Sequence, residues 1–88
     1  MMARDIRFST PGWCDYHSWR AMNSKTFERL TALINECRRS PFKGTGKPEA
    51  LKGRKAWSRR IDEKHRFVYM VTDEQLVVVS CRGHYGDH

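Results

Sequence analysis

Residues 66–82 read RFVYMVTDEQLVVVSCR, and this stretch decides the fold. It contains two runs, FVYMV at 67–71 and LVVV at 76–79, that are rich in the β-branched and aromatic residues favoured in strands. The polar tetrapeptide TDEQ at 72–75 separates them and is typical of a turn. The stretch therefore predicts a β-hairpin with strands over residues 66–72 and 75–82.

Upstream of this hairpin, residues 57–61 predict a third strand. The segment before it, residues 40–55, is a loop by composition, because proline and glycine exclude a long helix there. The residues concerned are Pro41, Gly44, Gly46, Pro48 and Gly53. We expect this loop to hold a short strand near Ala50 and Leu51.

The first half of the chain predicts a short strand over residues 4–8, followed by two helices. The first helix is expected to run to Met22, with Thr10 as N-cap and Pro11 in the first helical position. Asn23 and Ser24 break the chain and cap the next helix. That helix carries an apolar stripe at helical spacing: Phe27, Leu30, Leu33, Ile34 and Cys37.

The resulting order, β-α-α-β-β-β, implies an α+β fold in which a helical pair packs on one face of a small, mostly antiparallel sheet. A chain of 88 residues makes one domain, which we expect to span residues 1–88 with 86–88 as a short tail. Strand alternation places Arg59 on the opposite side from Ser58 and Arg60. Some of the basic side chains should then line the face of the sheet that the helices leave open.

The apolar runs, the first residues and the cysteines predict where in the cell the protein resides. No apolar run approaches the ~18–20 residues that span a bilayer, and the start lacks the apolar segment of a signal peptide. The cysteines Cys14, Cys37 and Cys81 are odd in number and far apart, so we expect small buried side chains and no disulfide framework. These features predict a cytoplasmic protein without membrane contact.

Positive charge is concentrated in one third of the chain. Residues 38–66 hold eleven Lys and Arg against three acids, while six basic residues face seven acidic ones elsewhere; the net charge is +7. Such a surface attracts a polyanion such as RNA or DNA without reading its sequence. Glu49, the first acid in this stretch, repels phosphates, so its presence favours a role in taking a proton from the ligand.

Metal-free RNA cleavage needs a base, a fixed cation and an acid. Glu49, Arg66 and His84 supply these residue types, and Tyr85 could stack on a base. Each also has an ordinary interpretation. Glu49 could be a solvated loop acid, and Arg66 could form an ion pair with Asp62 or Glu63. His84 could be an ordinary histidine near the end of the chain, and Tyr85 could cover the edge of the core. The sequence has no metal-ligand cluster and no cofactor motif, so we expect neither a metal nor a cofactor.

Three blocks carry a family resemblance: PFKGTGKPEAL at 41–51, WSRRI with HRFVY at 57–61 and 65–69, and CRGHY at 81–85. In order and spacing they resemble the YoeB/Txe branch of the RelE-type toxins of bacterial toxin–antitoxin systems. The resemblance implies a microbial RNase-like fold. It also implies an mRNA interferase, a ribosome-dependent endoribonuclease that cuts mRNA in the decoding site and stops translation.

Position by position, the resemblance implies Glu49 as general base, His84 as general acid and Arg66 as the cation that stabilises phosphate charge. Tyr85 would orient the RNA. Substrate contacts are also expected from basic residues of the loop and of the following strand: Lys47, Lys52, Arg59 and Arg60. The implied partners are mRNA on the ribosome with 16S rRNA of the small subunit, a cognate YefM/Axe-like antitoxin, and a second copy in a homodimer.

Two departures from the family pattern stand out: the loop at 52–56 is shorter by about two residues, and the chain continues through 86–88. Two other functions remain open on this sequence. One is a non-enzymatic ParE-like toxin that binds a protein target such as DNA gyrase, since one fold hosts several functions. The other is a plain RNA-binding module.

Overall fold

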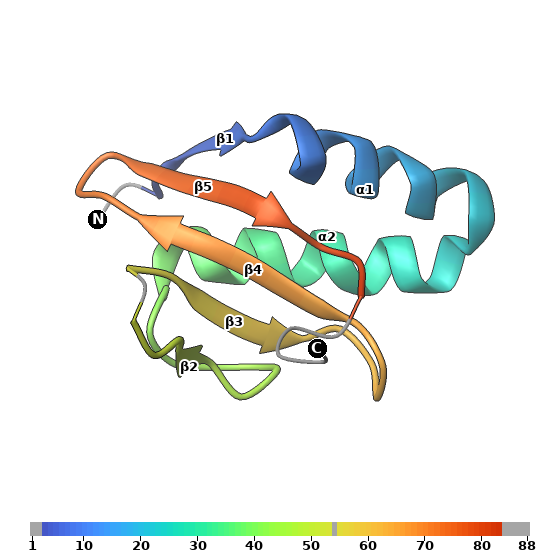
Figure 1. The fold of residues 1–88 in the computed structure, drawn as a ribbon. Coiled ribbons are helices and arrows are strands. Elements are labelled where there is room, and N and C mark those ends of the chain that lie inside the picture. Colours follow the sequence, from blue (N-terminus) through green and yellow to red (C-terminus); the bar gives the residue numbers. More distant parts are fainter. Residues whose placement is uncertain (1–2, 54, 84–88) are drawn as a thin grey trace.

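The computed structural model describes residues 3–53 and 55–83, and its elements follow the order drawn in Figure 1. They are β1 (Asp5–Phe8), α1 (Thr10–Met22), α2 (Ser24–Arg39), β2 (Glu49–Ala50), β3 (Trp57–Arg60), β4 (Arg66–Val71) and β5 (Gln75–Ser80). The strands form one sheet in the order β1-β5-β4-β3-β2, in which β1 runs parallel to β5 and the other neighbours are antiparallel. This confirms the α+β class, the helical pair and the hairpin, and the short strand expected in the loop appears as β2.

The two helices are set by polar caps at their ends. The Ser9 hydroxyl accepts a hydrogen bond from the Gly12 N–H at 3.1 Å, so Ser9 and not Thr10 is the N-cap of α1. Asn23 closes α1 with its backbone N–H and opens α2 with its side chain, whose Oδ1 accepts from the Thr26 N–H at 3.2 Å. Because one residue caps both helices, they are joined by a tight turn and pack side by side.

α1 lies directly on the backbone of β5. A Cβ at Gly12 would stand 2.3 Å from the Val78 carbonyl oxygen, so only glycine permits this approach. The buried Cys81 thiol contacts the Gly12 carbonyl at 3.7 Å, and burial, with the nearby charge of Asp15, raises its pKa to about 12. Cys37 is buried as well, but Cys14 is exposed, so the expectation of a buried side chain is wrong for Cys14.

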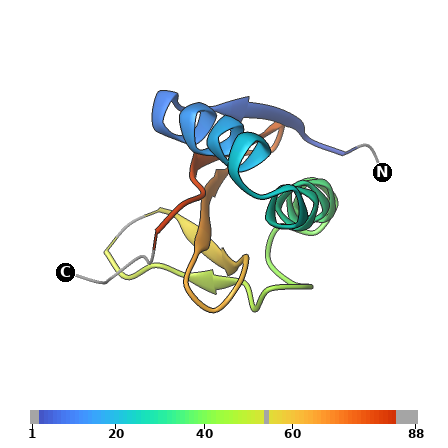
Figure 2. The same cartoon turned by 90° about the vertical axis from the view of Figure 1, so that its right-hand side faces the viewer.

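The sheet has one covered face and one open face. Both helices pack on the covered face, where Figure 2 shows α2 end-on beside the sheet. This core cluster comprises Trp19, Leu30, Leu33, Ile34, Cys37, Ile61, Phe67, Tyr69, Leu76, Val78 and Cys81. The other face holds a small cluster of Leu51, Ala56 and Val68 with Val79, and in the described part of the chain no helix covers it.

The covered face also contains a buried charge, the fully buried guanidinium of Arg59 on β3. Each of its five N–H donors has a partner within the protein. Nε donates to the Tyr69 hydroxyl at 3.3 Å, Nη1 to Glu36 Oε2 at 2.6 Å and to the Thr45 carbonyl at 3.1 Å, and Nη2 to the carbonyls of Ser40 and, at 2.9 Å, Lys43.

Arg59 thereby organises the loop at residues 40–46, which precedes β2. The Glu36 carboxylate that pairs with Arg59 also accepts from the Thr45 N–H at 2.9 Å and from its hydroxyl at 3.1 Å. The Tyr69 hydroxyl, which accepts from Arg59, donates to the Pro41 carbonyl at 2.6 Å. The loop is therefore wrapped around one guanidinium, and its shape depends on that group.

Replacing Arg59 with methionine tests this dependence. Methionine fills much of the volume but leaves the part-buried loop carbonyls and Glu36 without their donors, at about 1–3 kcal/mol for each group that loses its partner. We expect Arg59→Met to lower the free energy of unfolding by about 3 kcal/mol or more in urea titrations. Arg60→Met, at the adjacent exposed position, should cost about 0.5 kcal/mol or less; equal losses in the two variants would contradict the role given to Arg59.

Glu36 makes stability depend on pH in a defined direction. Burial alone would raise its pKa, but hydrogen bonds from Thr45 and the Arg59 guanidinium outweigh burial and hold the pKa below its usual value. A carboxyl with a lowered folded-state pKa stabilises the fold above its unfolded pKa of ~4.3, and this contribution is lost as pH falls through the folded value. Acid unfolding followed by circular dichroism should therefore be less steep below pH ~4.3 in Glu36→Gln than in the wild type. Glu74→Gln, an exposed acid, should leave the slope unchanged, and the same slope in Glu36→Gln would count against this account.

Candidate active site

Three of the predicted site residues lie on the open face of the sheet. In the strand register Glu49 of β2 is opposite Ser58 of β3, and Arg60 of β3 is opposite Arg66 of β4. Residues 58 and 60 are two apart on one strand and share a face, so Glu49, Arg60 and Arg66 share it too. Two like charges placed directly opposite each other destabilise a sheet, and an anion bound between them would relieve this repulsion.

Glu49 and Arg66 stand on the two sides of this site. Two strand spacings and two residues along the strand separate their Cα atoms by on the order of 10 Å. Both side chains are long, so they can reach a single nucleotide from opposite sides. Glu49 is exposed and Arg66 half-buried, with Arg66 Nη1 donating to the Asp62 carbonyl at 3.4 Å.

The end of the described chain reaches the same place. The Arg66 N–H donates to the carbonyl of Gly83 at 3.0 Å, which ties the segment after β5 to the start of β4. Gly83 is the last residue that the structure describes at this end. The predicted general acid His84 and the predicted stacking residue Tyr85 lie outside the described residues.

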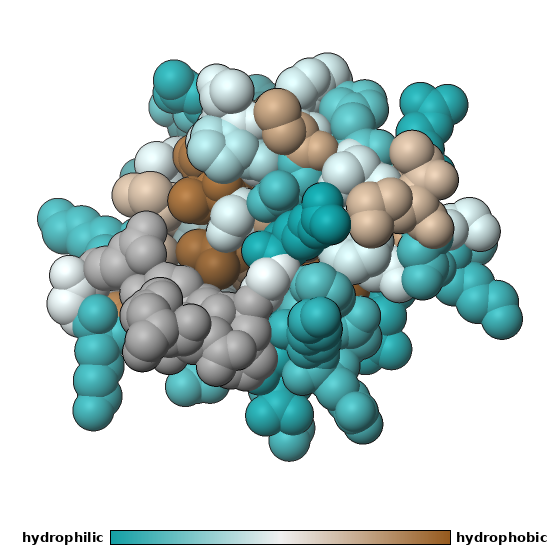
Figure 3. Space-filling model, turned by 45° about the vertical axis from the view of Figure 1, so that its right-hand side comes forward, coloured by the Kyte–Doolittle hydropathy of each residue, from teal (hydrophilic) through white to brown (hydrophobic). Residues whose placement is uncertain are grey.

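Lys47 and Lys52 flank this face on either side of β2, and both side chains are exposed. Lys47 has φ 52°, in the left-handed region, within a loop fastened to β3 by the bond from the Arg60 N–H to the Gly46 carbonyl at 2.7 Å. In the space-filling view, hydrophilic side chains project from the lower half of the molecule, where β2 and β3 lie in Figure 1 (Figure 3). Both lysines therefore lie close in sequence to Glu49, whose strand pairs with the strand that carries Arg60.

Arg59 is the exception among the predicted substrate contacts. It is fully buried on the covered face, and its donors are all engaged by Glu36, Tyr69 and the loop, so it does not present its charge to a ligand. The physical reason is strand alternation, which turns residue 59 away from the face that carries residue 60. Glu36, its partner, was not anticipated, because an acid beside an apolar helical stripe has the same pattern as a solvent-facing one.

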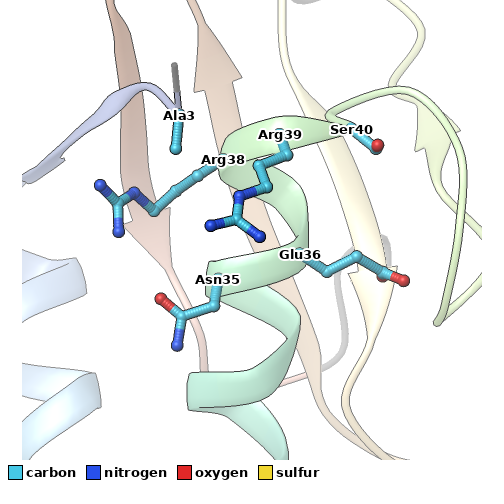
Figure 4. A pocket seen from close by; sticks show the side chains of 6 residues that line it. All are labelled: Ala3, Asn35, Glu36, Arg38, Arg39 and Ser40. Atoms are coloured by element: carbon cyan, nitrogen blue, oxygen red, sulfur yellow. The ribbon is translucent and has the colours of Figure 1, made fainter. Parts of the chain in front are cut away.

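Arg60 of the candidate site lines a pocket together with Arg29, Asp62 and Glu63. A second pocket lies at the C-terminal end of α2, lined by Ala3, Asn35, Glu36, Arg38, Arg39 and Ser40 (Figure 4). In this view Glu36 extends toward β3 while Arg38 points away from it, and Arg38 Nε donates to the Arg4 carbonyl at 2.7 Å. None of the predicted site residues lines this pocket. An open strand face fits an extended polymer better than an enclosed small molecule.

Within residues 3–53 and 55–83, no three histidine, cysteine or acidic side chains gather in an arrangement that could hold a metal ion. No helix in this part is long and apolar enough to cross a membrane.

Comparison with known proteins places the chain in a family. Residues 8–85 match the family model of the YoeB-like toxin of bacterial type II toxin–antitoxin systems. The chain is 51% identical over 82 residues to Toxin YoeB of Streptomyces coelicolor, covering 91% of this chain and 98% of that protein. The structure superposes on a YoeB/ParE toxin from Agrobacterium tumefaciens with a TM-score of 0.88 at 41% identity, covering 92% of this chain and 99% of that one.

A third relative has been solved in two assemblies. The Staphylococcus aureus YoeB dimer superposes with a TM-score of 0.87 at 33% identity, and a heterotetrameric YoeB–YefM toxin–antitoxin complex from the same organism with 0.84. Each comparison covers 96% of this chain and all of the other. The family model spans both helices, strands β2 to β5 and the face that carries Glu49, Arg60 and Arg66. This chain belongs to the family of YoeB-like toxins of bacterial type II toxin–antitoxin systems.

Proposed function

We propose that this chain is a metal-independent endoribonuclease that cuts mRNA on the ribosome in the cytoplasm and so inhibits translation. The observation that carries the proposal is the shared face of Glu49, Arg60 and Arg66, with Gly83 bonded to the backbone of Arg66. A carboxylate set among fixed cations is unfavourable for binding phosphate alone. It is favourable where a proton has to be removed beside a phosphate.

In the proposed reaction Glu49 takes the proton of a 2′-hydroxyl, and the 2′-oxygen attacks the adjacent phosphorus. Arg66 donates to the phosphoryl oxygens as their negative charge increases, because a guanidinium stays protonated and can hold two oxygens in parallel. His84 gives a proton to the departing 5′-oxygen as the bond from phosphorus to that oxygen breaks. The products are a 2′,3′-cyclic phosphate and a 5′-hydroxyl, and Tyr85 stacks on a base to orient the strand.

The basic side chains around this site hold the polymer. Arg60 lies opposite Arg66, and Lys47 and Lys52 stand on either side of β2, where they can contact neighbouring phosphates of mRNA or of 16S rRNA. These contacts do not read sequence. Presentation of the message in the decoding site of the small subunit then determines where the strand is cut.

The proposed protein partners follow from the relatives. The Staphylococcus aureus YoeB forms a complex with YefM and also a dimer. We expect this chain to bind a YefM-like antitoxin and to form a homodimer in its absence. The +7 charge of the chain favours an antitoxin segment rich in acids.

The acid and base assignments are tested by cleavage of a message held in the decoding site of purified ribosomes. Glu49→Gln and His84→Gln each remove a proton-transfer group at nearly constant size and should slow cleavage by ~10²-fold or more. Glu74→Gln, an exposed acid in the turn between β4 and β5, should cut at the wild-type rate. Wild-type cleavage by both site variants would exclude the mechanism.

The same assay separates the other functions. A ParE-like toxin would leave the message intact and inhibit DNA supercoiling by gyrase, and a plain RNA-binding module would bind the message without cutting it. Either result with the wild-type protein would refute the proposed function.

The role of Arg60 is tested by the salt dependence of binding to single-stranded RNA. Each phosphate contact contributes ~0.7 to the slope of log affinity against log salt. Arg60→Gln should weaken binding and reduce the steepness by about that amount, to a similar degree for RNAs of different sequence. Arg20→Gln, an exposed arginine on α1, serves as the matched control and should leave the slope unchanged. An unchanged slope in Arg60→Gln would remove Arg60 from the site.

A further inference from the structure

The segment that follows β5 is held by side chains from distant parts of the chain. β5 ends at Ser80, yet the Cys81 N–H donates to Asp15 Oδ2 at 3.0 Å, and the Cys81 carbonyl accepts from Trp19 Nε1 at 2.7 Å. Two residues later the Gly83 N–H donates to His65 Nδ1 at 2.8 Å. Three side chains thus bind three backbone groups within residues 81–83, where the chain leaves the sheet.

The side chains that hold this segment are themselves fixed. Trp19 is 5% exposed, and its ring meets the His65 ring edge-on with centroids 4.7 Å apart. The His65 N–H donates to Asp62 Oδ1 at 2.6 Å, and its carbonyl accepts from the Ile61 N–H at 2.9 Å. Burial alone would raise the pKa of Asp62, but the backbone N–H groups of His65 and Lys64 outweigh burial and lower it. His65 therefore has a defined position before it accepts the bond from Gly83.

This arrangement differs from an ordinary strand end. Backbone groups beyond the last ladder bond usually face water at little cost, and no tertiary contact is needed to satisfy them. Here Asp15 and Trp19 come from 66 and 62 residues away in sequence, and the Arg66 N–H adds a bond to the Gly83 carbonyl. Gly83 itself has φ 92°, which favours glycine although nothing lies within 4 Å of a Cβ there. Both the location and the direction of the chain at Gly83 are fixed.

We propose that Asp15, Trp19 and His65 form a latch that positions the chain end for catalysis by His84. The proposal rests on the proposed function, because the position of the chain at Gly83 affects cleavage only if the next residue is the general acid. The three side chains touch neither RNA nor the reacting atoms and are positioning residues. Their effect is on the chemical step, since a displacement of about 1 Å in a catalytic group can cost up to ~10²-fold in rate.

His65 offers the sharpest test, because one atom carries its contact. Asn Oδ1 stands at the same number of bonds from Cβ as His Nδ1 and is also an acceptor, so His65→Asn keeps the bond to the Gly83 N–H. His65→Ala removes it. His17→Ala is the matched control: His17 is a half-buried histidine on α1 whose Nε2 has no hydrogen-bond partner among the described residues.

Two readouts are needed, one for the latch and one for catalysis. Amide hydrogen exchange by NMR should show faster exchange at Gly83 in His65→Ala and near-native protection in His65→Asn and His17→Ala. Single-turnover cleavage of ribosome-bound message at saturating protein should fall by about 10–100-fold in His65→Ala. Affinity for the ribosome should stay within twofold of the wild type, and His65→Asn should restore most of the rate.

The outcomes separate the two proposals. If His65→Ala frees the Gly83 amide and still cleaves within twofold of the wild-type rate, the latch does not position His84. If the wild-type protein leaves the message intact, the proposed function fails, while hydrogen exchange still reports whether the latch holds the chain. Should His65→Ala fail to fold, Trp19→Phe removes the donor to the Cys81 carbonyl and keeps an aromatic ring. That variant should likewise lower the single-turnover rate with affinity unchanged, and a wild-type rate would overturn the latch.

Discussion

The structure depends on one buried guanidinium. Arg59 sits among apolar side chains of the covered face, where an unpaired charge would be prohibitive, so every N–H must find an acceptor. Glu36, Tyr69 and the carbonyls of residues 40–45 provide them. If the loop moved away, the guanidinium would lose its carbonyl acceptors and remain as an unpaired charge among apolar side chains. The same loop leads into β2, so the hydrogen bonds of the Arg59 guanidinium help to determine where Glu49 lies. The role is structural, although the residue type and its sequence neighbourhood suggest contact with phosphate.

The two faces of the sheet differ in how much apolar surface they bury. On one face Trp19 and the apolar side of α2 bury the residues of β4 and β5 that point toward them. The other face has only a small apolar cluster, beside which Glu49, Arg60 and Arg66 stand exposed or half-buried. This division explains how a small domain can tolerate two arginines opposite each other, because the face that holds them is not needed for the main core. In the described part of the chain no helix covers the face that holds the candidate site.

The candidate site is assembled from segments that are far apart in sequence. The proposed latch contributes to this assembly by holding the chain after β5. β2, β3 and β4 bring Glu49, Arg60 and Arg66 together through ladder pairing, whereas the end of the chain is held by side chains. α1 accordingly has two roles: its Gly12 lets it approach β5, and Asp15 and Trp19 bind the backbone just beyond that strand. A helix that looks like a simple cover for the core is thus linked to the proposed catalytic end.

The sequence by itself determined the elements and the family. The β-branched runs at 67–71 and 76–79 and the apolar stripe of α2 predicted the hairpin and the second helix, because local propensity and periodicity depend on neighbouring residues alone. The clustered charge predicted an anionic ligand, which stays a prediction. Only the tertiary structure decided that Ser9 and not Thr10 caps α1, and that Arg59 is buried while Arg60 is exposed. It also decided that Glu36 pairs with Arg59, and that Asp15 and Trp19 bind the backbone beyond β5. The reason is physical: a hydrogen bond between residues more than 60 positions apart leaves no trace in local composition. Which of two adjacent arginines faces solvent depends on which face of the sheet the helices cover.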